Sequence, residues 1–233
     1  MSKIESKNAL ITGGASGIGK LMGLQLLQKG LSTLVIWDVN ETLLQSTALE
    51  FKKMGYEVFI YLVDVMNTAQ VINIAAQVKK EVGKIDILIN NAGIVVGKYF
   101  IDHTHDEIDK TIGINCNGLM HITKEFLSDM MLTKQGHIVN IASAAGMVSN
   151  PKLSVYVASK FAVIGWSDSL RLEMEKENTN IKITTVTPFF ISTGMFEGVK
   201  SNIVPIVKPQ NAVDKIIRGI ENDRLYVRMP GIV

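Results

Sequence analysis

The chain has 233 residues, of which 47% are apolar and 20% are charged, and its 24 basic and 22 acidic side chains give a formal net charge of +2. This balance is typical of a folded globular protein and argues against a disordered chain. Because the basic residues are scattered along the sequence, we expect no nucleic-acid partner.

The N-terminal residues MSKIESK contain no apolar stretch of the kind found in secretory signals. No uninterrupted apolar run approaches the ~18 residues that a membrane-spanning helix needs. The single cysteine, Cys116, excludes an intramolecular disulfide and fits a reducing compartment. We therefore expect a cytoplasmic protein that has no membrane span and forms one domain over residues 1–233.

Short β-branched segments alternate with longer helical patterns along the whole chain. Strands are expected at 9–12, 33–38, 58–63, 85–90, 137–142 and 181–187, with a weaker candidate at 225–227. Helices are expected at 18–29, 41–53, 69–82, about 105–131, about 154–176 and 210–222. The strands are apolar almost throughout, which is typical of strands buried on both faces. This alternation predicts a single α/β domain, a doubly wound, Rossmann-type parallel sheet of about seven strands with helices on both faces.

A glycine-rich turn joins the first expected strand to the first expected helix, with the sequence Thr12-Gly13-Gly14-Ala15-Ser16-Gly17-Ile18-Gly19. Positions without a side chain let the backbone turn sharply and approach a pyrophosphate, while the helix N-terminus directs free N–H groups at the anion. The pattern predicts that Gly13, Ser16, Gly17, Ile18 and Gly19 bind a dinucleotide. Taken alone, such a turn also fits a purely structural role.

Acidic residues end the second and third expected strands. Asp38 follows Gly19 by 19 residues, about where an acidic group hydrogen-bonds the adenosine ribose in dinucleotide-binding folds. A carboxylate there would repel a 2′-phosphate, so we expect NAD rather than NADP. Asp64, with Val65 beside it, is expected to meet the adenine. For either aspartate, the alternative is that it only caps a turn.

Further motifs follow in a fixed order: Asn90-Asn91-Ala92-Gly93, then Ser143, then Tyr156-x₃-Lys160. Together with the glycine turn, they resemble the short-chain dehydrogenase/reductase family in order and spacing over essentially the whole chain. Asn115 falls where that family keeps its fourth active-site residue. The segments 36–40 and 136–146 are similar to the hydroxysteroid- and retinol-oxidising branch. The resemblance implies an NAD(P)-dependent enzyme that transfers a hydride between the cofactor and an alcohol or carbonyl group.

The resemblance also implies a role for each member of this catalytic set. Tyr156 would be the general acid/base, Ser143 would stabilise charge on the substrate oxygen, and Lys160 would lower the pKa of Tyr156 and hold the nicotinamide ribose. Asn115 would hold a water that links Lys160 to solvent. A phenol needs its pKa lowered by about 3 units, or roughly 4 kcal/mol, to act as a base near neutral pH. An ammonium about 4 Å away supplies roughly 4 kcal/mol at an effective dielectric near 20, although burial opposes it.

The resemblance places further residues beside the cofactor. Asn91, Ala92 and Gly93 would lie next to the adenosine ribose, and Pro188, Ile191 and Thr193 near the nicotinamide. The family usually has Pro-Gly where this chain has Pro188 followed by Phe189, so the pocket shape there is expected to differ.

The segment 189–207 is expected to form a substrate lid. Because it is strongly apolar, it favours a small hydrophobic alcohol, ketone or aldehyde as substrate. The alternative is that it packs only on the sheet or on a neighbouring subunit. The resemblance further implies a homodimer or homotetramer built on the helices near 105–131 and 154–176. No metal is expected, because the pair His103-x-His105 lacks a third ligand.

Two other classes of function are weighed against this one. A dinucleotide-binding sensor or regulator that no longer turns over is disfavoured by the intact set of Asn115, Ser143, Tyr156 and Lys160. A sugar-nucleotide epimerase or dehydratase shares the fold, but it usually carries a longer substrate domain than 233 residues provide.

Overall fold

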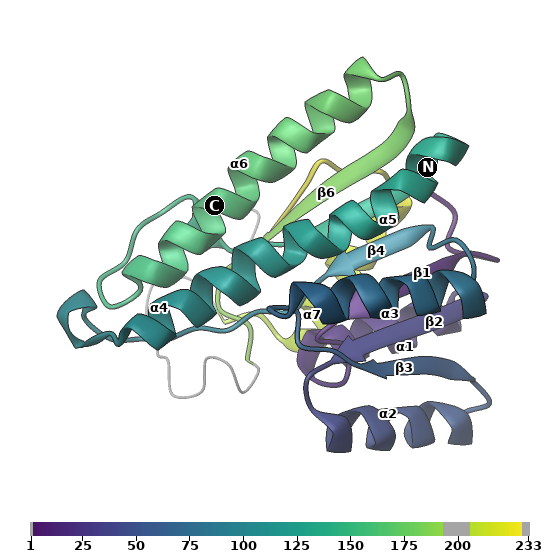
Figure 1. Ribbon diagram of the computed structural model, residues 1–233, viewed down its shortest axis with the longest axis horizontal. Helices are drawn as coiled ribbons and strands as arrows, with labels where there is room; N and C mark the ends of the chain where they lie inside the picture. The colour runs from purple at the N-terminus through teal and green to yellow at the C-terminus, as the bar shows by residue number, and fades with distance from the viewer. Residues whose placement is uncertain (1, 193–205, 230–233) are drawn as a thin grey trace.

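The strands of the computed structural model, which describes residues 2–192 and 206–229, lie in one parallel sheet (Figure 1). Within the described residues there are seven strands in the order β3-β2-β1-β4-β5-β6-β7, so the predicted doubly wound sheet is confirmed. The strands are β1 (Asn8–Thr12), β2 (Thr33–Asp38), β3 (Val58–Leu62), β4 (Ile87–Asn90), β5 (Gln135–Ile141), β6 (Asn180–Pro188) and β7 (Tyr226–Met229). The last strand is thus 226–229 rather than 225–227, and β4 begins at residue 87 rather than 85.

Helices cover both faces of this sheet. They are α1 (Gly17–Gln28), α2 (Glu41–Lys53), α3 (Thr68–Glu81), α4 (His105–Ile112), α5 (Leu119–Thr133), α6 (Ser154–Lys176) and α7 (Pro209–Glu221). The apolar residues of α1, α2 and α7 form one core with the sheet, and those of α3, α5 and α6 form a second core on the opposite face. The central strands β1, β2 and β4 are buried on both faces, as their continuous apolar sequences predict, whereas the edge strand β3 has exposed residues. In the part of the chain that the structure describes, no helix has both the length and the apolar character needed to cross a membrane.

Local sequence explains where several of these helices begin. The side chain of Asn40 accepts a hydrogen bond from the backbone N–H of Leu43 at the start of α2, at 3.0 Å. Thr104 and Glu107 form a reciprocal capping box at the start of α4. In both helices, polar side chains accept hydrogen bonds from backbone N–H groups that would otherwise be free at the N-terminus.

The region predicted as one helix near 105–131 is instead two α-helices joined by the π-helical segment Gly113–Gly118. The glycines at its two ends allow close contact with the loop after β3. A Cβ on Gly113 would lie 2.7 Å from Cε of Met66, and one on Gly118 would lie 2.8 Å from the carbonyl oxygen of Val65. Single π-turns inside helices are frequent at functional sites, and this one contains Asn115.

Candidate active site

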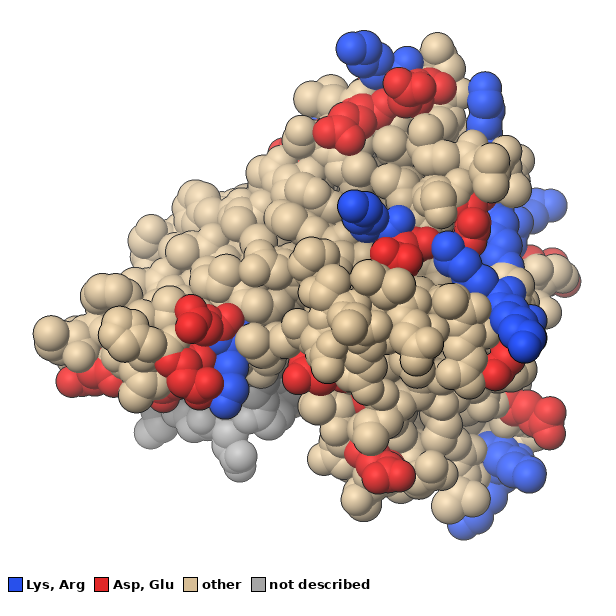
Figure 2. Space-filling view, in the orientation of Figure 1, with Lys and Arg blue, Asp and Glu red and all other residues tan. Residues whose placement is uncertain are grey.

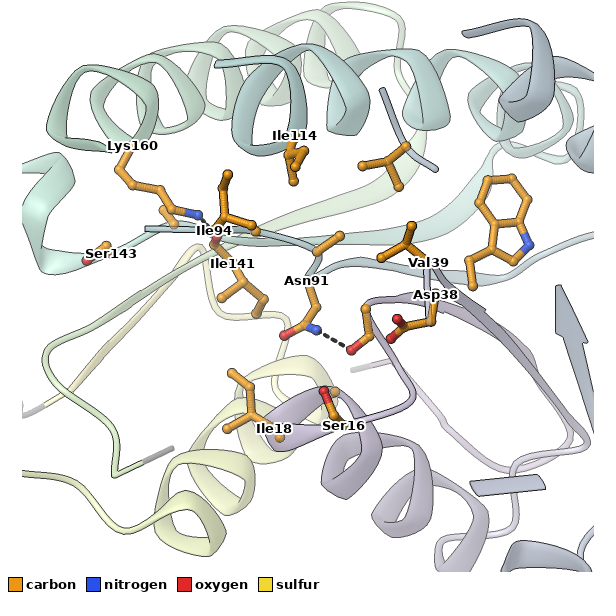
Figure 3. A pocket seen from close by; sticks show the side chains of 18 of the residues that line it. Ser16, Ile18, Asp38, Val39, Asn91, Ile94, Ile114, Ile141, Ser143 and Lys160 are labelled. Carbon is orange, nitrogen blue, oxygen red and sulfur yellow. Dashed lines mark hydrogen bonds between the residues drawn. The ribbon is translucent and has the colours of Figure 1, made fainter. Parts of the chain in front are cut away.

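A cavity of about 610 Å³ opens at the carboxyl ends of the strands, where β1 and β4 are neighbours although they are far apart in the sequence (Figure 3). This switch point of a doubly wound sheet is where such folds bind ligands. The cavity is lined by most of the predicted site residues: Gly13, Ser16, Gly17, Ile18, Gly19, Asp38, Asp64, Val65, Asn91, Ala92, Gly93, Ser143, Tyr156, Lys160, Pro188 and Ile191. Asn115 is not among the lining residues, and Thr193 lies outside the described residues, as does most of the predicted lid 189–207.

The glycine turn forms a backbone cradle on one side of the cavity. Gly13 and Gly17 adopt positive φ angles of 61° and 52°, which favour glycine. A Cβ on Gly19 would lie 2.2 Å from the carbonyl oxygen of Gly13, so no side chain fits there. Ser16 makes no side-chain capping hydrogen bond to α1, and the first turn of that helix has no acidic residue. The free N–H groups and the positive dipole end of α1 are therefore available to an anion. The pyrophosphate of a dinucleotide is an anion of this kind.

Thr12 and Asn91 hold this cradle against the end of β4. The Nδ2 atom of Asn91 donates hydrogen bonds to the carbonyl oxygens of Thr12 and Gly13, at 3.0 and 2.9 Å. Figure 3 shows the hydrogen bond to Gly13. In return, Oγ1 of Thr12 accepts from the backbone N–H groups of Asn91 and Ala92, both at 3.1 Å. These hydrogen bonds hold the glycine turn and the end of β4 together, so this side of the cavity is formed without a ligand. The sequence motif contains Thr12, but sequence reasoning did not assign it this role.

Asp38 both caps a turn and lines the cavity, so its two sequence interpretations are compatible. Its Oδ2 accepts from the N–H of Ala15 at 3.1 Å, and its Oδ1 accepts from the N–H of Asn40 at 3.0 Å. Since a carboxylate offers about four lone-pair sites, it retains capacity for ribose hydroxyls. Asp64 likewise lines the cavity while its Oδ1 accepts from the N–H of Met66 at 2.9 Å.

Ser143, Tyr156 and Lys160 meet on the opposite side of the cavity. Ser143 follows β5, while Tyr156 and Lys160 lie in the first two turns of α6, on one face of the helix. Both α6 side chains are 5% exposed. The Nζ atom of Lys160 donates a hydrogen bond to the carbonyl oxygen of Ile141 at 2.9 Å and lies 5.7 Å from the centre of the Tyr156 ring.

Burial is the main effect on the pKa values of Tyr156 and Lys160 in the free protein. Burial raises the pKa of Tyr156, and a hydrogen bond with Ser143 opposes that rise. Burial also lowers the pKa of Lys160 to about 8. In the free protein, desolvation of the phenol is therefore the largest effect on the pKa of Tyr156, and the ammonium of Lys160 is directed at Ile141. That Lys160 lowers this pKa stays a prediction.

Asn115 lies behind the cavity wall rather than on it. Its Oδ1 accepts from the N–H of Ile94 at 2.8 Å, and its Nδ2 donates to the carbonyl oxygen of Ile94 at 2.9 Å and to Oγ of Ser159 at 3.1 Å. Both Asn115 and Ser159 are almost fully buried. The side chain is thus committed to protein groups, and it braces a residue, Ile94, that does line the cavity.

Several lining residues were missed by sequence reasoning. They are mostly apolar: Trp37, Val39, Val63, Met66, Ile94, Lys110, Ile114, Ile141 and Ala142. Most adjoin a residue of a recognised motif, which is the one signal that points to them. Phe189, which stands where the family usually has glycine, packs edge-to-face on Phe190 with ring centres 4.6 Å apart. Within the described residues, no group of three or more His, Cys, Asp and Glu side chains is arranged to hold a metal ion.

The doubly wound fold and this cavity define a nucleotide-binding α/β enzyme, with an acid/base cluster facing a phosphate cradle. The family model for short chain dehydrogenases matches residues 7–203, so the chain belongs to that family. It is 42% identical over 226 residues to epidermal retinol dehydrogenase 2 of Mus musculus, covering 95% of this chain and 73% of that protein. It is 36% identical over 225 residues to estradiol 17-beta-dehydrogenase 11 of Pongo abelii, covering 96% and 75%.

Solved structures of similar fold contain nicotinamide dinucleotides. A short chain dehydrogenase/reductase from Burkholderia phymatum in complex with NAD is 27% identical, with a TM-score of 0.91 over 100% of this chain and 92% of that one. A short-chain dehydrogenase from Sphingobium yanoikuyae in complex with NADPH is 25% identical, with a TM-score of 0.88 over 97% and 89%. The chain is therefore an oxidoreductase that acts on alcohol or carbonyl groups with a nicotinamide dinucleotide.

Proposed function

We propose that this protein uses NAD(H) to interconvert a hydrophobic alcohol and the corresponding ketone or aldehyde, with Tyr156 as the general acid/base. One observation carries the proposal: Ser143, Tyr156 and Lys160 line the same cavity as the glycine cradle and Asp38. A single bound molecule of dinucleotide size can thus reach from the phosphate-binding turn to the proton-transfer group.

Different residues bind the cofactor and transfer the proton. The glycine cradle holds the pyrophosphate, Asp38 the adenosine ribose, and Lys160 the nicotinamide ribose. When bound, the dinucleotide supplies or accepts the hydride. Tyr156 exchanges a proton with the substrate oxygen through its hydroxyl, and Ser143 donates a hydrogen bond to that same oxygen. Because burial raises the pKa of Tyr156, the phenol stays protonated at neutral pH and is ready to donate during carbonyl reduction.

The preference for NAD over NADP rests on Asp38. The N–H groups of Ala15 and Asn40 hold its carboxylate at the cavity edge, so it cannot easily move away from a 2′-phosphate. Two negative groups at hydrogen-bonding distance would repel each other, whereas ribose hydroxyls can donate to the carboxylate.

The proposal of a hydrophobic substrate is supported by the apolar side chains around Tyr156. Val95 and Leu153 pack against the cluster that Tyr156 forms with Ala145 and Val157. Phe189 adds an aromatic ring to the cavity wall where the family usually has glycine. The names of the similar proteins, a retinol and an estradiol dehydrogenase, refer to substrates of this kind.

The test of the function is Tyr156→Phe assayed with a panel of long-chain alcohols and ketones, with NAD(H) and NADP(H) measured separately. The variant should lose turnover at least a hundredfold and keep its affinity for NADH, because only the proton-bearing oxygen is removed. Tyr226→Phe is the matched control, since the Tyr226 hydroxyl bonds Asp168 away from the cavity. Undiminished activity of Tyr156→Phe would reject Tyr156 as the proton donor.

We also propose a cytoplasmic homodimer or homotetramer built on α5 and α6. The support is apolar side chains left exposed on these helices: Leu132 (84%), Phe161 (45%) and Leu172 (55%). Sedimentation equilibrium of the purified protein tests the assembly, and fractionation of expressing cells tests the location.

A further inference from the structure

Ser159 occupies a central place behind the active site, although neither the sequence motifs nor the proposed mechanism gives it a role. It lies in α6 between Tyr156 and Lys160, and its side chain is completely buried. Its Oγ donates a hydrogen bond to the carbonyl oxygen of Tyr156 at 2.7 Å. The same atom accepts a hydrogen bond from Nδ2 of Asn115 at 3.1 Å.

Ser159 and the backbone of Ile94 favour the same orientation of the Asn115 amide. Because that proton is used on the carbonyl oxygen of Tyr156, Oγ of Ser159 can only accept from Asn115. The amide must therefore present its NH₂ group to Ser159. Both N–H bonds of that group are then used, one on Ser159 and one on the carbonyl oxygen of Ile94, while Oδ1 accepts from the N–H of Ile94.

The chain of hydrogen bonds runs from the catalytic helix to the cavity wall. It links the backbone of Tyr156 through Ser159 and Asn115 to Ile94, a lining residue. The wall beside it is tightly packed, because a Cβ on Gly93 would lie 3.2 Å from Oδ1 of Asn115 and 3.7 Å from Nζ of Lys160. Gly93 therefore lies next to the side chains of both Asn115 and Lys160.

We propose that Ser159 is a positioning residue: it locks the Asn115 amide so that the 93–94 wall and the α6 pair Tyr156 and Lys160 keep a fixed distance across the cofactor site. This inference rests on the proposed function of the site. Ser159 does not line the cavity, so it acts through Asn115. Its effect must therefore disappear when Asn115 is removed.

The chain offers a matched control for this proposal in Ser167, two turns further along α6. Ser167 is also buried, donates to a carbonyl of its own helix, that of Val163, at 2.6 Å, and accepts from Nδ2 of an asparagine, Asn140, at 2.9 Å. Ser167→Ala thus removes the same number and kind of hydrogen bonds as Ser159→Ala, but not next to the cavity. A difference in cofactor binding or activity between the two variants therefore reflects the place of Ser159 beside the active site and not a general loss of stability.

The experiment compares both alanine variants for NADH affinity, for the pH dependence of kcat and for thermal unfolding of the free protein. Affinity is measured by titration of protein fluorescence, and kcat with the alcohol of the panel that turns over fastest. We expect Ser159→Ala to weaken NADH binding about fivefold, to lower kcat about tenfold and to shift the pH profile. Ser167→Ala should lower the unfolding temperature to a similar extent and leave the other quantities unchanged. The same changes in both variants would overturn the proposal.

A double-mutant cycle tests the route through Asn115. In an Asn115→Ala background, Ser159→Ala should change NADH affinity and kcat by less than twofold, whereas Ser167→Ala should have the same effect on stability as in the wild type. Independent, multiplicative effects of Ser159→Ala and Asn115→Ala would overturn the inference. Failure of the proposed function shows separately as full activity of Tyr156→Phe. The NADH titration and the side-chain amide NMR signals of Asn115 would still test the positioning role in that case.

Discussion

The ammonium of Lys160 donates to the carbonyl oxygen of Ile141, 2.9 Å away at the end of β5, and it forms no ion pair with a carboxylate of residues 2–192 or 206–229. Burial removes the ammonium from water, and a neutral carbonyl oxygen compensates for this less than a carboxylate would, so burial lowers the pKa of Lys160 to about 8. The position is thus suited to holding a cofactor at the expense of the stability of the free protein.

We therefore predict that Lys160→Met stabilises the free protein near neutral pH, by on the order of 1 to 3 kcal/mol, while activity falls at least a hundredfold. The sign with pH follows from linkage: between about 8 and about 10.4 the folded state has released a proton that the unfolded state keeps. Wild-type stability consequently rises over this range, and the advantage of the methionine variant shrinks. Urea unfolding of both proteins from pH 7 to 10 measures this; an advantage that grew with pH would contradict it.

Gly19→Ala should prevent dinucleotide binding and destabilise the fold, because the new Cβ would meet the carbonyl oxygen of Gly13 at 2.2 Å. Overpacking of this kind costs about 1 to 3 kcal/mol. Gly165→Ala is the control: no atom lies within 4 Å of its Cβ position inside α6, so we expect stabilisation of about 0.5 to 1 kcal/mol. Thermal unfolding and NADH titration distinguish the two variants. Equal cofactor affinity in both would show that the glycine cradle does not bind the dinucleotide.

Sequence could predict the parts of the site that depend on local spacing. The glycine turn needs only its own backbone conformation and a following helix, and the pair Tyr156 and Lys160 needs only helical spacing. Asp38 is predictable because it ends the strand next to β1 and therefore lies close to the glycine turn that follows β1. There the N–H of Ala15 donates a hydrogen bond to its carboxylate. In each of these cases the determining contacts lie within a few residues or across one strand pair.

The parts that sequence could not predict depend on contacts between distant segments. The π-helical segment at 113–118 requires Gly113 and Gly118 to fit against Met66 and Val65, which no helical pattern in the sequence reveals. The orientation of Lys160 depends on a carbonyl of β5, nineteen positions earlier in the chain, and its burial decides the direction of the pKa shifts.

Asp38→Ser should weaken the discrimination of NAD from NADP at least tenfold, mainly through tighter binding of NADP, because the charge that repels a 2′-phosphate is removed. Asp64→Asn is the control, since Asp64 lines the cavity but is anchored to Met66 in the loop after β3. Competitive titration with both dinucleotides gives the ratio of dissociation constants. A ratio that is unchanged in Asp38→Ser would show that the cofactor assignment is wrong.

His137 should make the protein sensitive to acid. It is buried in β5, with Nε2 2.8 Å from Oγ1 of Thr184 and Nδ1 3.0 Å from Oγ of Ser2. Burial lowers the pKa of its ring to about 4, and attraction by Asp223 only partly opposes this. Because the unfolded chain binds a proton near pH 6.5 and the folded one does not, stability is complete above that pH and is lost as pH falls toward 4, by up to about 1.4 kcal/mol per pH unit.

The measurement is urea unfolding of the wild type, His137→Gln and His121→Gln at intervals from pH 7 to 4.5. His121 is exposed on α5, so its variant should follow the wild-type curve. His137→Gln should show a shallower loss between pH 6.5 and 4.5, because the neutral amide has no proton to gain in the unfolded state. If all three curves ran parallel over that interval, the acid sensitivity would have to arise from carboxylates such as Asp223. Burial raises the pKa of Asp223, but the pKa is lowered overall, and hydrogen bonds donated by Ser2 contribute to this.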